Sequence, residues 1–449
     1  MTKIYKVLLV SISILLFATA CETETVVIDN DIDSARLQQV LQERSANQQR
    51  TQWWSDAKYG VIIHWNPSSV AGIEMSWGRE CYPPDLDKPA WTACPTIPQE
   101  QYDSLYKQFN PVNFNAEEWI QTFQQLGFKY VVFVTKHHDG FSMFDNPYSW
   151  YKICSDGSPV QYDITKQFAD AAHKYGMKLG FYYSLSDWFH PDYYSYNHSN
   201  YINFVNNQIE YLLSNYGKID LLWFDGGQEF QYWDGEELYR RIVALQPEIV
   251  INNRLGRYKM DYFDVEGYFG DFNTGELWEK CGSVTNVFSY SPEQQVYSSS
   301  ELFSQLFRTW GNGGNFLLGI GPRADGSLDP DQMKPISEVY QWLSKYGECI
   351  YGTTAGPYYN NAWGWATYKD NVMYLIVSVG INAIEVPKFS SDVNITRVAA
   401  ITDGSDVKFT DKSNSYVFSY SNVSGSYTVI KVEFDKKVSS FSYLINGGN

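Results

Sequence analysis

The sequence predicts an α/β fold, a (β/α)8-like barrel followed by a C-terminal antiparallel β-sandwich. Through most of the chain, short and almost uninterrupted apolar runs alternate with amphipathic stretches, as is typical of a parallel sheet buried on both faces. At least six such units follow one another, which suits a closed barrel better than the alternative, an open doubly wound sheet. After Gly352 the pattern changes to short strands separated by Gly, Asp, Asn and Ser, which is typical of a sandwich.

The N-terminus has the features of an export signal. Lys3 and Lys6 precede an apolar run from Val7 to Phe17, and small residues lead directly to Cys21. This ending resembles a bacterial lipobox, which predicts that residues 1–21 are a signal peptide and that Cys21 is lipidated; the alternative is a plain signal peptide. Residues 22–50 are acidic and polar and predict a tether. We therefore expect a protein anchored by lipid to the bacterial outer membrane, on its periplasmic or cell-surface face.

Residues 51–354 are expected to form the barrel. Its first predicted strand is 59–65, and each later strand follows a predicted helix: 117–126 then 130–136, 164–175 then 178–183, 201–216 then 219–224, 236–245 then 249–253, and 300–310 then 315–320. A helix over 342–351 closes this region. Residues 355–449 are expected to form the sandwich, with strands at 372–378, 397–401, 407–409, 416–420, 427–434 and 441–445.

The amino-acid composition argues against nucleic-acid binding and is compatible with sugar binding. A net charge of −17 opposes nucleic-acid binding, because a polyanion would be repelled from most of the surface. The 36 Tyr and 15 Trp mostly serve packing, but flat aromatic faces also suit stacking against sugars. Five cysteines follow Cys21; Cys81 and Cys94 bracket a Pro-rich loop and form a disulfide if the compartment is oxidising.

Reactive side chains gather where the predicted strands end. In a barrel these ends share one face, which holds the active site. Three of the six histidines lie there beside an Asp and an Arg, which favours a shared pocket over isolated structural side chains. The set, in chain order, is His64, His137, His138, the pair Tyr182-Tyr183, Trp223, Asp225 and Arg254. A metal ion is the less favoured use of these residues, because no His-Glu-x-x-His motif accompanies them.

A pair of carboxylates predicts glycoside hydrolysis. Asp225 ends an apolar strand and precedes two glycines that allow close approach of a ligand, so it is the expected nucleophile; its alternative role is a helix cap. The second carboxylate is expected in the segment 270–279, where spacing alone does not choose among Asp271, Glu276 and Glu279.

From about Trp53 to Thr353 the chain resembles glycoside hydrolase family 29, the retaining α-L-fucosidases. The resemblance rests on five segments that occur in order: Trp53-Trp54-x-x-Ala57-Lys58-Tyr59-Gly60-Val61-Ile62-Ile63-His64-Trp65, Phe109-Asn110-Pro111-x-x-Phe114-Asn115, Lys136-His137-His138-Asp139-Gly140-Phe141, Leu222-Trp223-Phe224-Asp225-Gly226, and Gly313-Gly314-Asn315-Phe316-Leu317-Leu318-Gly319-Ile320-Gly321-Pro322-Arg323-Ala324-Asp325-Gly326.

The resemblance implies Asp225 as nucleophile and a barrel followed by a β-sandwich. It also implies a fucose pocket made by His64, His137, His138, Tyr183, Trp223 and Arg254. The family's acid/base on a Thr-x-Glu-like loop corresponds best to Glu276; because this loop is short here, Glu279 is the second choice. Where many members have a Glu-Trp-Tyr run, this chain has Glu74-Met75-Ser76-Trp77, so Trp77 or Glu74 is expected to face the sugar.

The expected activity is removal of terminal fucose from fucosylated oligosaccharides or glycoconjugates by double displacement, without a cofactor. The alternatives are another retaining exo-glycosidase, such as a galactosidase, and an anchored glycan-binding lipoprotein without catalysis. The short acid/base loop keeps the second alternative open. The sequence does not select the fucosyl linkage or the oligomeric state.

Overall fold

The computed structural model describes residues 34–80, 96–226, 234–255, 260–266, 276–359, 361–388, 393–402, 407–420, 427–438 and 444–445. The predicted lipidation of Cys21 and the predicted bond between Cys81 and Cys94 lie outside the described residues. None of the helices within these ranges combines the length and the apolar composition that a membrane span requires.

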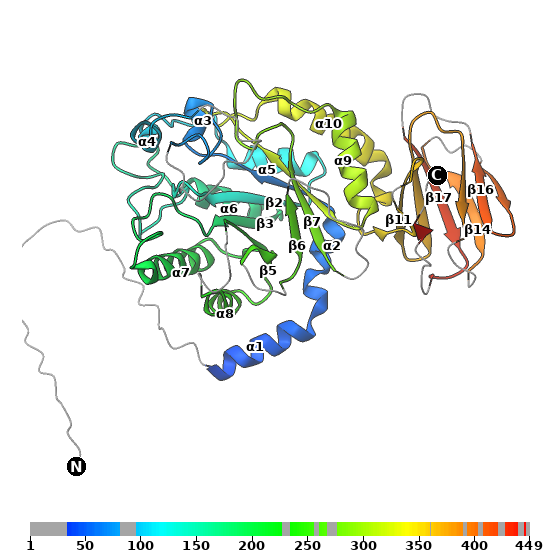
Figure 1. The fold of residues 1–449 in the computed structure, drawn as a ribbon, viewed down its shortest axis with the longest axis horizontal. Coiled ribbons are helices and arrows are strands. Elements are labelled where there is room, and N and C mark those ends of the chain that lie inside the picture. Colours follow the sequence, from blue (N-terminus) through cyan, green and yellow to red (C-terminus); the bar gives the residue numbers. More distant parts are fainter. Residues whose placement is uncertain are drawn as a thin grey trace, which may run out of the picture.

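A parallel eight-stranded sheet forms the barrel, in the order β5-β4-β3-β2-β1-β8-β7-β6. A single parallel bridge between Asn252 and Tyr262 joins the two edge strands. The predicted (β/α)8-like barrel is therefore confirmed (Figure 1). The strands are β1 (Tyr59–Ile63), β2 (Tyr130–Lys136), β3 (Lys178–Ser184), β4 (Leu221–Asp225), β5 (Val250–Ile251), β6 (Phe263–Glu266), β7 (Trp278–Ser283) and β8 (Asn315–Ile320).

Helices surround this sheet, and several of them begin at residues whose side chains cap them. Asn115 and Asp163 accept the free N–H groups at the starts of α5 and α6, and Ser298 forms a capping box with Glu301 at the start of α9. The helices are α1 (Ser34–Ala46), α2 (Gln52–Ala57), α3 (Ser68–Ala71), α4 (Gln99–Asp103), α5 (Ala116–Gln125), α6 (Ile164–Lys174), α7 (His198–Asn215), α8 (Gly235–Leu245), α9 (Ser299–Gly311) and α10 (Pro330–Tyr346), with 3-10 turns η1 (Gln48–Thr51), η3 (Leu105–Lys107), η5 (Asn253–Leu255) and η6 (Gly347–Cys349).

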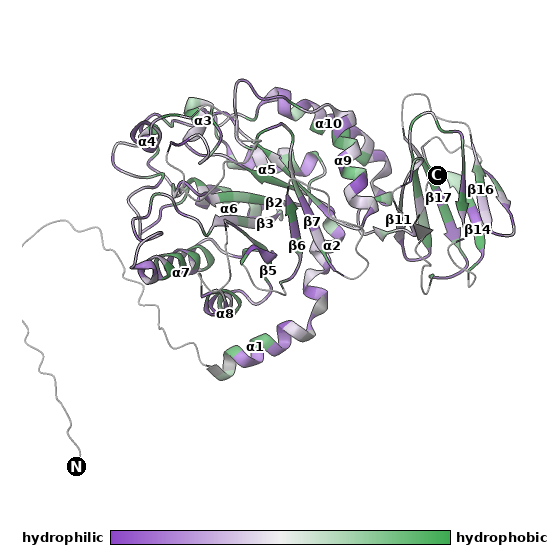
Figure 2. Cartoon of the chain, viewed as in Figure 1, coloured by the Kyte–Doolittle hydropathy of each residue, from purple (hydrophilic) through white to green (hydrophobic). Residues whose placement is uncertain are grey.

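Two of the strands, β6 and β7, were not expected from the sequence. Apolar and charged residues alternate in β6, Phe263-Asp264-Val265-Glu266, and β7 contains the adjacent charged residues Glu279 and Lys280, so both lack the continuous apolar run of the other strands (Figure 2). Asp264 and Glu279 from these strands are buried within the barrel and contact other polar groups there. The barrel interior is therefore partly polar at β6 and β7, and a search for continuous apolar runs does not detect such strands.

The segment expected as a tether contacts the barrel at its end. Arg44, the last basic residue of α1, is buried and donates to the carbonyls of Pro247 and Ile249 and to Asp261. Arg50 pairs with the same Asp261 carboxylate. Asp261 lies next to the bridge between Asn252 and Tyr262 that joins β5 and β6. These contacts therefore stabilise the barrel at the point where its two edge strands pair through one bridge.

The C-terminal residues form antiparallel sheets around a second apolar core, as predicted. A five-stranded sheet, β14-β17-β12-β11-β9, faces a three-stranded sheet, β13-β16-β15, and a short parallel pair joins β10 and β18 (Figure 1). Phe307 of α9 packs against Tyr427 with ring centroids 4.7 Å apart and so connects the two cores. The strands are β9 (Thr354–Ala355), β10 (Tyr358–Tyr359), β11 (Gly364–Lys369), β12 (Val372–Val377), β13 (Ala383–Pro387), β14 (Ile395–Ala400), β15 (Lys408–Asp411), β16 (Ser415–Ser419), β17 (Thr428–Phe434) and β18 (Leu444–Ile445).

Candidate active site

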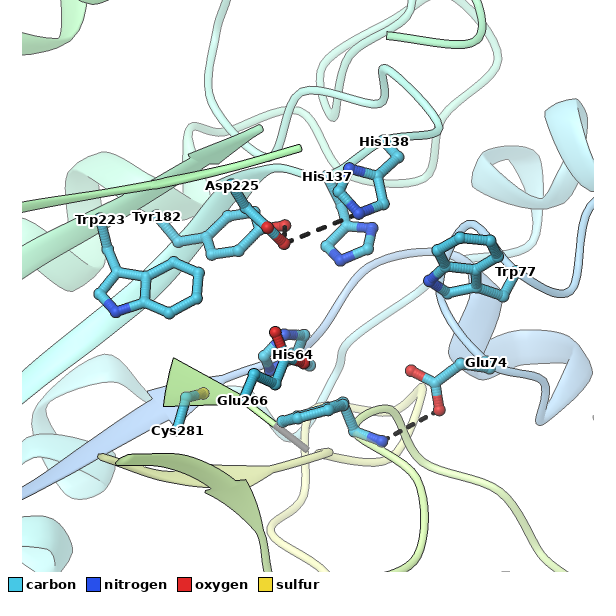
Figure 3. Close-up of a pocket in the computed structure, with 11 residues that line it drawn as sticks. His64, Glu74, Trp77, His137, His138, Tyr182, Trp223, Asp225, Glu266 and Cys281 are labelled. Carbon is cyan, nitrogen blue, oxygen red and sulfur yellow. Dashed lines mark hydrogen bonds and ion pairs between the residues drawn. The ribbon is translucent and has the colours of Figure 1, made fainter. Parts of the chain in front are cut away.

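A cavity of about 280 Å³ lies at the carboxyl ends of the barrel strands. Its lining comes from the ends of β1, β2, β3, β4, β6 and β7 and from the loops that follow them, so residues far apart in the chain meet there (Figure 3). The lining residues are His64, Glu74, Trp77, His137, His138, Tyr182, Trp223, Asp225, Glu266, Cys281 and Phe288.

Asp225, the last residue of β4, is held in place at both carboxylate oxygens. Arg254 donates to Oδ1 at 2.6 Å and the backbone N–H of Gly226 donates to the same oxygen at 2.7 Å. The hydroxyl of Tyr182 donates to Oδ2 at 2.7 Å. Burial alone would raise the pKa of Asp225, but the charge of Arg254, helped by the hydrogen bond from Tyr182, outweighs it and holds that pKa well below its usual range. Asp225 is therefore ionised in the free pocket.

Arg254 lies behind Asp225 rather than in the pocket lining. Its guanidinium sits over the Trp223 ring, 4.7 Å from the centroid, and pairs with Asp264 and Glu266 as well as with Asp225. One cation thus contacts three carboxylates: its charge holds Asp225 ionised, whereas burial still raises the pKa of Asp264 to about 7. Its contribution is to position and keep the charge of Asp225.

Three histidines from two strand ends face Asp225. Burial lowers the pKa of His64 to about 3 and of His138 to about 4, and it also lowers the pKa of His137. The Nε2 atom of His138 lies 3.6 Å from Oδ2 of Asp225 (Figure 3). Neutral imidazoles each offer one donor and one acceptor, so this wall suits the hydroxyl groups of a neutral ligand.

Aromatic rings lie next to the histidines in the lining. Trp77 contacts the rings of His138 and Trp188 edge-on, and Phe288 packs against His64 with centroids 4.8 Å apart. Glu74 accepts the backbone N–H groups of Phe288 and Ser289 and so fixes this loop. Burial raises the pKa of Glu74 to about 7, although these hydrogen bonds oppose the rise.

The side chains of His137, His138 and Asp225 also satisfy the spacing of a metal site, with one ligand atom from each within 4.8 Å of the others. The chemistry of the surroundings does not favour a cation there, because Arg254 already neutralises the same carboxylate at 2.6 Å. Burial among neutral imidazoles and aromatic rings suits a polyhydroxyl ligand with apolar faces better.

Comparison with known proteins decides the family. The α-L-fucosidase family model matches residues 27–348. Human tissue α-L-fucosidase is 31% identical over 387 residues, which cover 77% of this chain and 80% of that protein. The chain belongs to the α-L-fucosidase family.

Related structures agree with this membership. α-L-Fucosidase isoenzyme 1 from Paenibacillus thiaminolyticus has 28% sequence identity and a TM-score of 0.76, over 87% of this chain and all of that chain (100%). An α-L-fucosidase from Bacteroides thetaiotaomicron, at 23% identity and a TM-score of 0.75, covers 86% of this chain and shares the fold. The protein is therefore a glycoside hydrolase of the α-L-fucosidase family.

The structure brings most of the expected fucose-contacting residues together. His64, Glu74, Trp77, His137, His138 and Trp223 line the cavity with Asp225, and Arg254 supports it from behind. Tyr183 lies elsewhere: its hydroxyl donates to Gln208 of α7 at 2.8 Å, on the outer face of the sheet. Successive strand residues face opposite sides, so Tyr182 occupies the pocket instead.

The two expected acid/base residues occupy different environments. Glu276 is exposed. The preceding residues 267–275, which include Asp271, lie outside the described residues. Glu279 is fully buried in β7 and accepts from Trp223 Nε1 at 3.0 Å and from the Tyr130 hydroxyl. Glu279 is not among the cavity residues. Its role is to hold the Trp223 ring through the hydrogen bond from Trp223 Nε1.

Glu266 is a cavity carboxylate that the sequence interpretation missed. It ends β6, pairs with Arg254 at 2.8 Å and keeps 30% of its side chain exposed. The sequence feature that would identify it is its position as the last residue of a short strand, two residues beyond Asp264. Because β6 was not recognised as a strand, that signal could not be used.

Glu279 makes stability dependent on pH. Burial, followed by the nearby Asp264 charge, raises its pKa from 4.5 to about 8. The folded state therefore keeps a proton that the unfolded chain releases above pH 4.5, and stability falls as pH rises from about 5 to 8. We expect Glu279→Gln to reduce this slope by up to about 1.4 kcal/mol per pH unit, measured by urea unfolding at several pH values.

Glu117→Gln is the matched control for that experiment. Glu117 pairs with Lys174 at the surface, and this hydrogen bond lowers its pKa, so it titrates below the interval. The control should keep the wild-type slope between pH 5 and 8. An unchanged slope in Glu279→Gln would show that Glu279 is ionised in the folded protein.

Proposed function

We propose that this protein hydrolyses terminal α-L-fucosyl residues of fucosylated oligosaccharides or glycoconjugates with retention of anomeric configuration. The observation that carries the proposal is an ionised carboxylate, Asp225, in a cavity whose lining is made mostly of neutral histidines and aromatic rings. A nucleophile has to be ionised and hydrogen-bonded in a fixed orientation, and Arg254 and Tyr182 meet both requirements.

In the first step a carboxylate oxygen of Asp225 attacks the anomeric carbon and the bond to the leaving oxygen breaks. A carboxylic acid protonates that oxygen as it departs, which leaves a fucosyl ester on Asp225. In the second step the same acid, now a carboxylate, removes a proton from water, and the water oxygen displaces Asp225 from the anomeric carbon. The aglycone leaves as an alcohol and fucose as the free sugar.

Glu276 is our assignment for the acid/base, on the basis of the Thr274-Gly275-Glu276 motif. Glu266 is the competing assignment, because it already lines the cavity beside Asp225. Its contact with Arg254 at 2.8 Å argues against this role, because the carboxylate is already engaged inside the protein and is less free to reach a leaving oxygen. Glu279 anchors Trp223 and is the least suitable of the three.

The cavity lining offers both kinds of contact that fucose requires, apolar and hydrogen-bonding. The 6-methyl group of this deoxy sugar requires an apolar surface, which Trp77, Trp223 and Phe288 supply. Its hydroxyl groups require partners, which the histidines supply. A desolvated hydrogen bond to a histidine rejects sugars without that hydroxyl more strongly than an apolar wall rejects an added group.

We expect the protein without residues 1–21 to release the aryl group from an aryl α-L-fucoside. Asp225→Ala should reduce kcat by at least about 10⁴-fold while fucose still binds, because the variant removes the nucleophile and keeps the histidine wall. Proton NMR of the first product gives the stereochemistry. Release of galactose instead would identify a galactosidase, and binding without any hydrolysis would identify a glycan-binding protein.

The acid/base is tested with three matched variants, Glu276→Ala, Glu266→Ala and Glu279→Ala. Azide can replace water in the second step and needs no general base, so it restores turnover of an activated fucoside only in the variant that lacks the acid/base. We expect rescue of Glu276→Ala with formation of fucosyl azide. Rescue of Glu266→Ala alone would transfer the role to the cavity carboxylate.

We also propose that the protein is exported and anchored through a lipidated Cys21, because the signal pattern of residues 1–21 ends in small residues before this cysteine. Expressed with its full N-terminus in a Gram-negative bacterium, the protein should fractionate with membranes. Cys21→Ala should remove the lipid mass from the mature N-terminus and move the protein to the soluble fraction. Membrane association that survives this change would overturn the proposed anchor.

A further inference from the structure

The adjacent histidines His137 and His138 each bond a buried serine hydroxyl through Nδ1. His137 Nδ1 lies 2.6 Å from Ser76 Oγ, and His138 Nδ1 lies 2.6 Å from Ser184 Oγ. Both serines are fully buried, so their hydroxyl protons have to go to protein acceptors. The direction of each bond follows from the other partners of each serine.

Ser184 has its proton committed elsewhere. Its hydroxyl donates to the carbonyl oxygen of Ser186 at 2.8 Å, and a carbonyl can only accept. A hydroxyl has a single proton, so Ser184 Oγ accepts from His138. The proton of the neutral His138 ring is therefore on Nδ1, and Nε2, which faces Asp225, carries a lone pair.

Ser76 is in the opposite situation. Its oxygen already accepts the backbone N–H of Asp139 at 2.8 Å, and His137 is the partner that remains for its proton. If His137 donated instead, the Ser76 proton would be buried without an acceptor, which costs roughly 1–3 kcal/mol. Ser76 therefore donates to His137 Nδ1, and the ring proton of His137 is on Nε2.

We propose that Ser76 and Ser184 are positioning residues that fix the neighbouring histidines in opposite tautomers, so that the pocket presents an N–H donor on His137 beside a lone-pair acceptor on His138. The pair recognises a hydroxyl group, which can accept from His137 and donate to His138. A fluorine or ether oxygen at that place meets only the first requirement, and a hydrogen atom meets neither.

The acceptor role of His138 has a consequence for the free pocket. Its Nε2 lone pair and the Asp225 carboxylate are two acceptors 3.6 Å apart, with no proton between them. Burial lowers the pKa of His138 to about 4, so protonation does not relieve this contact near neutral pH. A ligand hydroxyl that donates into the gap relieves it, which favours binding of an alcohol over an apolar group.

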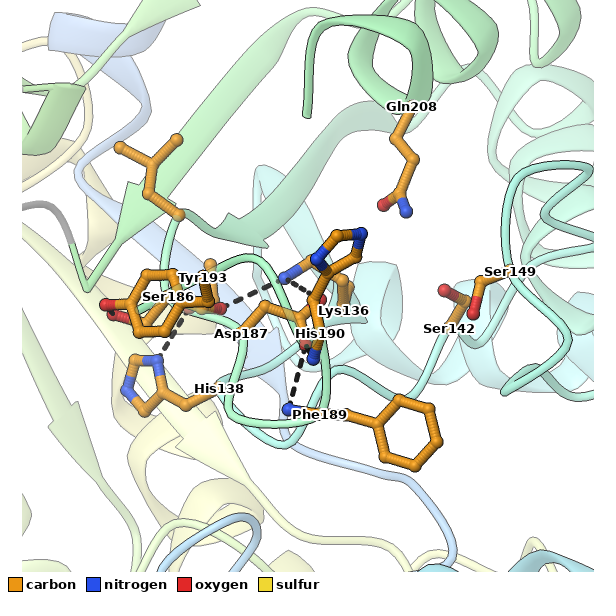
Figure 4. A network of polar contacts seen from close by, with 12 residues as sticks. Lys136, His138, Ser142, Ser149, Ser186, Asp187, Phe189, His190, Tyr193 and Gln208 are labelled. Carbon is orange, nitrogen blue, oxygen red and sulfur yellow. Dashed lines mark hydrogen bonds and ion pairs between the residues drawn. The ribbon is translucent and has the colours of Figure 1, made fainter. Parts of the chain in front are cut away.

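The carbonyl of Ser186 is fixed by a buried charge pair. Lys136 Nζ donates to the same carbonyl at 3.0 Å and pairs with Asp187 at 3.4 Å, and both side chains are buried (Figure 4). A cation bound to a carbonyl holds that oxygen in place as an acceptor for Ser184. The Ser186 carbonyl thus accepts from both Lys136 and Ser184, which leaves the Ser184 oxygen as the acceptor for His138.

The direct test is nitrogen NMR of the whole ligand-free protein labelled with ¹⁵N-histidine, near pH 7. Protonated and lone-pair ring nitrogens have well separated shifts, and His137→Asn and His138→Asn assign the two rings. We expect His138 to be protonated at Nδ1 and His137 at Nε2. The same tautomer in both rings, or a doubly protonated His138, would overturn the proposal. Because no substrate is involved, this result is independent of the proposed function.

Ser184→Ala provides the functional arm. It removes the acceptor of His138 Nδ1–H, so we expect the Nδ1–H signature to be lost and kcat/KM for an aryl fucoside to fall about 10- to 100-fold. Ser158→Ala is the matched control: Ser158 is also buried, but its hydroxyl accepts only from Val160 N–H and is not in the cavity lining. An unchanged His138 spectrum in Ser184→Ala would also overturn the proposal.

Discussion

The ion pair between Asp225 and Arg254 is the interaction on which the site depends. A carboxylate buried at the end of a barrel strand would normally take up a proton, since removing a charge from water is costly. Arg254, 2.6 Å away and stacked on Trp223, keeps Asp225 ionised, and it balances Asp264 and Glu266 as well. The barrel supplies the geometry, because η5 brings Arg254 beside the end of β4.

The histidines around this charge pair are kept neutral. Burial holds the pKa values of His64, His137 and His138 below their usual range, so these residues act as hydrogen-bonding groups and not as cations. Below the pocket floor, Glu279 keeps its proton and fixes Trp223. A fixed carboxylate, Asp225, facing neutral donors and acceptors suits an uncharged sugar that develops positive charge at its anomeric carbon.

The sequence predicted the strands that are continuously apolar, and with them the barrel and the residues that directly follow those strands. His64, His137, His138 and Asp225 were identified because an apolar run ends at or beside each of them. The same rule failed for β6 and β7, in which charged residues interrupt the apolar run, and so Glu266 was missed. Which of Tyr182 and Tyr183 faces the pocket depends on the register of β3, and adjacent aromatic residues give no pattern from which to read it.

The most direct test of the account is to trap the sugar on its nucleophile. A 2-deoxy-2-fluoro-α-L-fucosyl fluoride combines a good leaving group with a fluorine that slows both steps, so an ester with the nucleophile accumulates. After proteolysis, mass spectrometry should locate one fluorofucosyl group on Asp225, and Asp225→Asn should remove it. A label on Glu266 or Glu74, or inactivation without any covalent sugar, would contradict Asp225 as the nucleophile.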